Sequence, residues 1–267
     1  MPARTGRFHG VVGLTLILAT AVAADEARTR DAARNVLGKH ADAVITVRLT
    51  VKSRMVFQGR ERNSGESTLE IAGTVLSPSG LTAVSDFTSN PSALFPNQPE
   101  GPRVESETMD VKLLLRDGRE LPARFVLRDQ DLDLAFLMPE EKGLTLPFVT
   151  LEKGQVPKPL DDLILLYPMG KALNREIAVV SAPVRAVVKR PRTFVVAEYL
   201  SGFQSLGGPA FDAAGRAVGL VVLRRSAVAP TPGGSVRDML DLISPVVLTA
   251  EDVLQVAAQA AAPKGAE

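Results

Sequence analysis

The stretch Ser201–Phe211 has the form of a loop that presents a nucleophile, because a glycine pair closed by a proline leads into an apolar strand. Leu206 occupies the position where such a loop would carry its nucleophile. Ser205 lies one position earlier and would need a slipped turn to become exposed. A serine is a weak nucleophile until a neighbouring base takes its proton. The loop therefore indicates where chemistry would be located, without a side chain that performs it.

The bases that could activate a serine are scarce. The chain has two histidines, His9 and His40. His9 lies in a segment that we expect to be removed. His40 follows the first expected helix, and we expect it on the surface near the helix C-terminus, where a positive charge is favourable. The strands beside the loop contain no lysine for a Ser–Lys pair, so the sequence offers no base.

Composition excludes several other kinds of site. Cysteine is absent, which excludes disulfides, thiolate metal sites and a cysteine nucleophile. Lys and Arg total 31 against 30 Asp and Glu, so the charge gives no argument for a nucleic-acid partner. Asp129, Asp131 and Asp133 resemble a calcium loop only in their acidic spacing, because the glycine and glutamate of such a loop are missing. We predict no metal, no cofactor and no nucleic-acid ligand.

The elements that must position the loop are short strands separated by turns. In Ala43–Lys52, apolar Ile45, Val47, Leu49 and Val51 alternate with polar residues, which is typical of a half-buried strand. Similar patterns predict strands over residues 68–76, 81–87, 111–116, 120–127, 162–167, 177–188, 193–198, 217–223 and 239–243. Residues 128–137 are expected to form a short acidic turn that runs into a buried strand. Residues 58–67 are expected to form a loop or hairpin and residues 89–107 a long surface loop. The pattern indicates an all-β protein with two barrels joined near residues 152–160.

Helices are expected at both ends of this β region. The first should cover Asp25–Leu37 and stop at Gly38, and the last should run from a cap at Thr249 to about Ala260. Ahead of them, a basic start, the apolar run Val11–Ala23 and small residues at its end are typical of an export signal. A retained membrane anchor is the alternative. We expect a periplasmic or secreted protein without a transmembrane span after cleavage.

Four segments in a consistent order resemble the trypsin-like serine proteases (peptidase S1), in particular the bacterial HtrA/Deg kind. Gly73–Leu81 resembles the approach to the catalytic histidine, and Arg116–Ala135 resembles the segment that carries the catalytic aspartate. Tyr167–Gly170 and Glu198–Leu220 resemble the G-x-P-x-G and G-N-S-G-G-P segments. The resemblance covers residues 44–254. It implies two six-stranded Greek-key barrels with a cleft between them.

The same resemblance implies a broken catalytic triad. The aspartate falls on Asp133, whereas the histidine falls on Phe87 and the serine on Leu206. The residue two before the serine, which shares the oxyanion hole with it, falls on Gln204 instead of glycine. Non-glycine residues resist the backbone conformations that glycine permits, so the oxyanion hole at Gln204 and Leu206 is also expected to be altered.

We therefore predict a catalytically inactive protease fold that acts as a binding or scaffold protein in the cell envelope, with a protein or peptide ligand in the cleft between the barrels. The alternative is a serine endopeptidase of the HtrA/Deg type with a non-standard catalytic arrangement. Phe87 and Leu206 are expected to touch in the cleft and exclude water from Asp133. The expected domains are a signal peptide (1–23), an N-terminal helix (24–42), two barrels (43–151 and 152–248) and a C-terminal helix (249–262).

Overall fold

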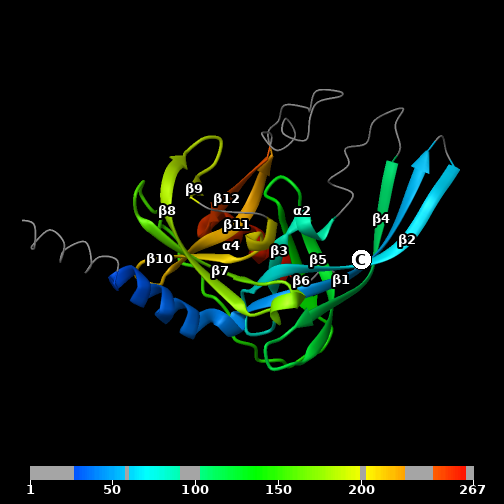
Figure 1. Cartoon of the computed structure of the whole chain (residues 1–267), viewed down its shortest axis with the longest axis horizontal. Helices are drawn as coiled ribbons and strands as arrows, with labels where there is room; N and C mark the ends of the chain where they lie inside the picture. Colours follow the sequence, from blue (N-terminus) through cyan, green and yellow to red (C-terminus); the bar gives the residue numbers. More distant parts are fainter. Residues whose placement is uncertain (1–26, 58–59, 91–102, 199–202, 226–242, 263–267) are drawn as a thin grey trace, which may run out of the picture.

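Two closed antiparallel barrels of six strands each form the body of the protein (Figure 1). The structure, a computed structural model, describes residues 27–57, 60–90, 103–198, 203–225 and 243–262. The predicted all-β fold with two six-stranded barrels and short terminal helices is confirmed. The expected export signal lies outside the described residues.

The first barrel has the strand order β1-β2-β3-β6-β5-β4. Its strands are β1 (Val44–Phe57), β2 (Arg60–Val75), β3 (Thr82–Ser85), β4 (Arg103–Leu114), β5 (Glu120–Asp129) and β6 (Leu134–Pro139). The apolar residues that alternate in β1 are buried in the core of this barrel. Beyond the barrel, β1, β2 and β4 continue together as a projecting three-stranded arm (Figure 1).

The second barrel repeats this plan with the strand order β10-β11-β12-β9-β8-β7. Its strands are β7 (Asp162–Pro168), β8 (Ile177–Val188), β9 (Phe194–Ala197), β10 (Pro209–Asp212), β11 (Ala217–Arg225) and β12 (Ile243–Thr249). The final strand was expected over residues 239–243; Ile243 begins β12, and residues 239–242 lie outside the described residues. The run Val246–Leu248 is buried and pairs with β11, which extends the strand to Thr249.

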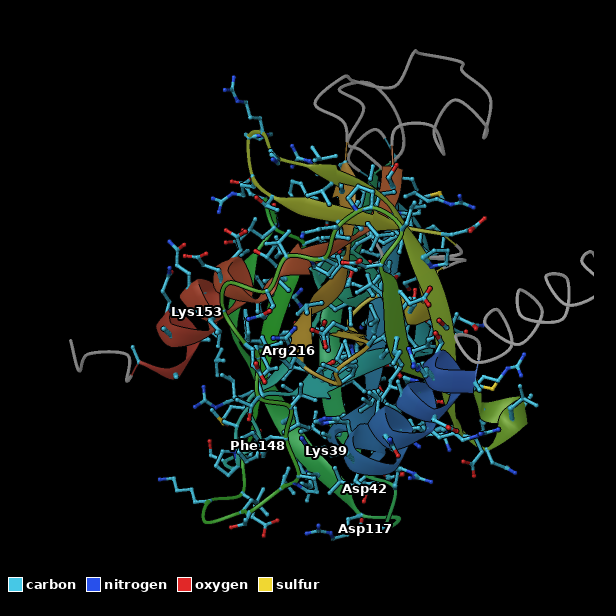
Figure 2. All side chains as sticks on the ribbon, turned by 90° about the vertical axis from the view of Figure 1, so that its left-hand side faces the viewer. Lys39, Asp42, Asp117, Phe148, Lys153 and Arg216 are labelled. Atoms are coloured by element: carbon cyan, nitrogen blue, oxygen red, sulfur yellow. The ribbon has the colours of Figure 1, made fainter. Side chains whose placement is uncertain are left out.

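Short helices connect and flank the barrels. They are a helix over residues 27–40, η1 (Ala41–Ala43), α2 (Asp86–Ser89), η3 (Lys171–Leu173), η4 (Phe203–Ser205) and α4 (Ala250–Ala261). The first helix was expected to stop at Gly38 but continues to residue 40, where Figure 2 shows Lys39 and Asp42 close to its end. Among the described residues, no helix has both the length and the apolar character needed to cross a membrane.

Three apolar clusters hold these elements together. One fills the first barrel, and a second fills the second barrel. The third contains residues of both barrels and of both terminal helices, including Phe136 of β6, Phe211 of β10, Val36 and Val253. Because this third cluster is shared, neither barrel can be separated from the other without exposing apolar surface to water.

Candidate functional site

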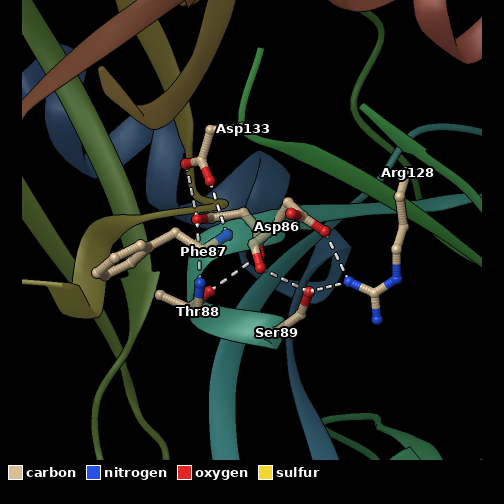
Figure 3. A network of polar contacts seen from close by, with 7 residues as sticks. Asp86, Phe87, Thr88, Ser89, Arg128 and Asp133 are labelled. Carbon is tan, nitrogen blue, oxygen red and sulfur yellow. Dashed lines mark hydrogen bonds and ion pairs between the residues drawn. The ribbon is translucent and has the colours of Figure 1, made fainter. Parts of the chain in front are cut away.

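Asp133 is the one polar side chain of the expected triad, and it is buried between the two barrels with 3% exposure. Its carboxylate accepts hydrogen bonds from the Phe87 N–H at 2.7 Å (Figure 3), from the Ser85 hydroxyl at 2.8 Å and from the Leu223 N–H at 2.6 Å. The first two donors belong to the first barrel and the third belongs to β11 of the second. Asp133 therefore joins the barrels through hydrogen bonds.

The pKa of Asp133 is raised to about 6, because burial disfavours the charged carboxylate. The three hydrogen-bond donors oppose this rise without cancelling it, and the nearby carboxylate of Asp86 adds to it. Its backbone has a φ of 56°, a left-handed conformation that is uncommon outside glycine. These values describe a carboxyl group that is held in place at some energetic cost.

Phe87 lies on α2, a single helical turn that follows β3, rather than on the strand expected over residues 81–87. Ser85 caps this turn by accepting a hydrogen bond from the Thr88 N–H. The turn directs the Phe87 N–H toward Asp133 while its ring extends away from Arg128 (Figure 3). The ring is 6% exposed and packs within the core of the second barrel, although Phe87 belongs to the first half of the chain.

Leu206 is fully buried in the same cluster as Phe87. It was expected at the tip of a loop facing the cleft, but its side chain has become part of the second barrel's core. Its N–H, which the resemblance assigns to the oxyanion hole, donates to the Phe203 carbonyl at 3.4 Å within η4. Gln204, the other oxyanion-hole position, is exposed and lines a neighbouring pocket.

The glycine pair after Leu206 is required by packing. Gly207 has a φ of +90°, and a Cβ there would lie 2.4 Å from the carbonyl oxygen of Ala72. A Cβ on Gly208 would lie 2.4 Å from the carbonyl oxygen of Leu166. The Thr74 hydroxyl also donates to the Gly207 carbonyl at 2.7 Å. The loop thus keeps its shape because it fits between two strands, whichever side chain stands at position 206.

A second polar network lies on the other side of α2 and was not predicted. Asp86 is 2% exposed, and its carboxylate accepts from Arg128 at 2.6 Å (Figure 3). Arg128 also donates to the Ser89 hydroxyl and stacks on the Phe125 ring at 3.7 Å. The Ser-Asp pair at the end of a strand is a signal for a helix start, but no local pattern points to Arg128. This network fixes α2 and hence the position of Phe87.

His40 does not approach the site. It was expected on the surface, and this prediction is wrong because the helix continues past Gly38 and carries the side chain inward. Its ring is 8% exposed and lies 4.7 Å from the Phe211 ring, and its Nε2 atom is buried without a hydrogen-bond partner. Burial, with a contribution from Lys39, lowers the pKa of His40.

A family profile decides the ancestry of this arrangement. The profile of the trypsin-like peptidase domain matches residues 72–220, more than half of the chain. The chain belongs to the trypsin-like peptidase domain family. The resemblance predicted from the sequence is therefore confirmed, and the match includes Phe87, Asp133 and Leu206.

Solved structures of HtrA-type proteases share the fold of this trypsin-like chain. The HtrA-type protease AlgW with tripeptide and a variant of it with tripeptide each superpose with a TM-score of 0.55 at 19% sequence identity. The match covers 85% of this chain and 62% of each of those chains, so this chain spans less than two thirds of their length. No curated protein sequence matches.

The chemistry open to the site follows from this geometry. The hydroxyl bonded to Asp133 is that of Ser85, which is itself fully buried, so a substrate carbonyl cannot reach it. Within the described part of the chain, no three His, Cys, Asp or Glu side chains are placed to hold a metal ion. Asp129, one member of the acidic run, instead accepts a hydrogen bond from the Leu132 N–H. In this arrangement the carboxylate of Asp133 is engaged by Ser85, Phe87 and Leu223.

Proposed function

We propose that this trypsin-like protein is a non-catalytic member of its family that is exported to the cell envelope and binds extended peptide segments. The proposal against catalysis rests on the burial of Phe87 and Leu206 in one apolar core and on the engaged N–H of Leu206. Without a base, a nucleophile or a free oxyanion-hole donor at these positions, covalent catalysis lacks its parts. Export rests on the apolar run near the N-terminus.

The observation that carries peptide binding is an apolar pocket of about 350 Å³ beside Phe87. Both barrels and η4 contribute to its lining. The lining includes Leu69, Ile71 and Ala72 of β2, Pro168 at the end of β7 with Met169 and Gly170 after it, and Phe87, Phe203 and Gln204. A pocket of this size, with apolar walls and a few polar groups, accommodates one large apolar side chain.

A free strand edge lies close to this pocket. β12 pairs with β11 along residues 219–225, but on the other side the described partner β10 pairs only as far as Leu220. The Val221 N–H and carbonyl still bond to Gly208 and Gly207, and the Leu223 N–H bonds to Asp133. Beyond Leu223 the edge is open among the described residues. An extended peptide can add to such an edge through its main chain and insert alternate side chains into a pocket.

The experiment compares two glycine substitutions. A Cβ at Gly170 or at Gly65 would meet no atom within 4 Å, and neither residue has a positive φ. Gly170 lines the pocket, whereas Gly65 lies in the projecting arm. We expect Gly170→Trp to fill the pocket and abolish binding to an immobilised pool of random peptides, while Gly65→Trp binds like the wild type.

A fluorophosphonate probe tests the catalytic alternative on the same proteins. We expect no covalent adduct on the wild-type chain. A stable adduct would show that a serine is activated by an arrangement other than the expected triad, and would refute the non-catalytic proposal. Equal peptide capture by the two tryptophan variants would instead refute the pocket as the binding site.

A further inference from the structure

Arg225, at the end of β11, lies beside the pocket-lining ring of Phe87. Its guanidinium carbon is 5.1 Å from the centre of that ring, and the residue is exposed. Phe87 in turn packs against Phe203 with the ring centres 5.3 Å apart. An exposed cation is therefore held over an aromatic face that forms part of an apolar pocket, an arrangement that is itself favourable.

The carboxylates around this pocket already have partners. Glu70, which lines the pocket, accepts two hydrogen bonds from Arg175, at 2.6 and 2.8 Å. Asp86 is paired with Arg128, and Asp133 is surrounded by three donors. No carboxylate in the described part of the chain forms an ion pair with Arg225. The guanidinium of Arg225 is thus a cation without an anionic partner of its own in that part of the chain.

We propose that this site selects acidic peptides, with an apolar side chain in the pocket and a carboxylate on Arg225. The proposal rests on the peptide binding proposed above and adds the chemical class of the ligand. A guanidinium donates two parallel hydrogen bonds to a carboxylate. Because the guanidinium of Arg225 is already stacked on Phe87, it loses less conformational freedom when it binds the carboxylate. A neutral or basic segment would leave this donor pair unused.

The geometry also restricts the spacing within the peptide. An extended chain advances about 3.3 Å per residue, with successive side chains on opposite faces. The 5.1 Å between the guanidinium and the Phe87 ring centre therefore places the carboxylate one or two residues from the apolar residue. A peptide in which the acid lies much further along the chain should gain little from Arg225.

Arg224 provides an internal control. It precedes Arg225 on the same strand, and its guanidinium lies 5.4 Å from the ring of Phe194 rather than Phe87. Phe194 does not line the pocket. Neighbouring side chains of a strand point to opposite faces. Substitution of Arg224 therefore changes the net charge of the protein by the same amount as substitution of Arg225, but leaves the proposed contact between Arg225 and the peptide carboxylate intact.

The test measures fluorescence anisotropy with labelled peptides that share one apolar residue and differ only in Glu, Gln or Lys two positions away. We expect wild type to bind the Glu peptide about three- to tenfold more tightly than the Gln peptide, as for an exposed charge-assisted pair. Arg225→Gln should remove this preference, and Arg225→Glu should reverse it toward Lys. Arg224→Glu should keep the preference for Glu.

The outcomes separate the two proposals. If wild type binds all three peptides equally, or if the Arg224 and Arg225 variants behave alike, the acidic preference is wrong while peptide binding stands. If wild type binds none of the peptides and none of the random pool, both proposals fail. Melting curves of each variant show that the substituted proteins are folded.

Discussion

The expected catalytic centre has a polar half at Asp133 and an apolar half at Phe87 and Leu206. Around Asp133 the polar contacts persist, with three donors from two barrels on one buried carboxylate. At Phe87 and Leu206, where the resemblance leads one to expect a histidine and a serine, apolar side chains share one core. The carboxylate also connects the barrels, whereas a histidine and a serine at the other two positions would serve only chemistry. The comparison suggests that a group is retained where the fold depends on it.

The largest effect should come from introducing the histidine and serine that the family resemblance assigns to these two positions. We expect Phe87→His with Leu206→Ser to lower the free energy of unfolding by on the order of 5 kcal/mol. Both side chains are buried, so their polar replacements lose packing contacts and leave buried polar groups without hydrogen-bond partners. Thermal and urea denaturation measure this loss. The volume-conserving pair Phe87→Leu with Leu206→Met should cost much less. A double variant as stable as wild type would mean that the apolar half is not a structural plug.

A second effect concerns the polar half and its dependence on pH. The native carboxyl of Asp133 takes a proton near pH 6, whereas in the unfolded chain it does so near its ordinary value of 3.8. Native protein therefore binds more protons in this window, and wild type should gain stability relative to Asp133→Asn as the pH falls from 7 to 4. The full gain is about 3 kcal/mol. Unfolding curves of both proteins at each pH give their free energies of unfolding. A difference between the two proteins that does not change with pH would contradict the raised pKa.

The smallest effect concerns the Ser85 hydroxyl, which donates to Asp133 and also accepts from the Thr88 N–H at the start of α2. Ser85→Ala removes a hydroxyl that donates to Asp133 at 2.8 Å and should cost about 1 kcal/mol. Because this hydrogen bond lowers the pKa of Asp133, its loss should raise that pKa. The pH at which the free energy of unfolding begins to increase on acidification should then be higher. Ser89→Ala is the matched control, since Ser89 bonds to Arg128 and the Asp86 carbonyl instead. An equal shift in both variants would show that α2, rather than the donor, sets the pKa.

The sequence predicted strands where apolar residues recur between turn signals. The strand over residues 177–188 was predicted at both ends, and β1 was found from its alternating apolar residues. Residues 58–67 were expected to form a loop or hairpin, and β1 and β2 pair there as a hairpin, whereas residues 103–107 were expected in a loop but form the start of β4. In this projecting arm, β2 and β4 are held to β1 by backbone hydrogen bonds, while many side chains are exposed and polar. A pattern of burial cannot reveal strands that are not buried.

The residues of the candidate site could be named from the sequence, but their conformations and contacts could be predicted only in part. The resemblance to trypsin-like proteases assigned Phe87, Asp133 and Leu206 to one group, and the structure places Phe87 next to both of the others. The helical turn at Phe87 and the inward direction of Leu206 depend on contacts with residues far along the chain, such as Leu223 and Arg128. The same holds for the approach of Arg225 to Phe87. These contacts follow from closing two barrels against each other, which no local pattern contains.

The shared carboxylate of Asp133 also makes the site a natural reporter of motion. The amide protons of Phe87 and Leu223 come from different barrels and are held by the same side chain. Any opening that separates the barrels there must release at least one of them to solvent. Their hydrogen exchange should therefore follow the opening of the barrel interface, and a ligand that bridges both barrels should slow the exchange of these two amides together.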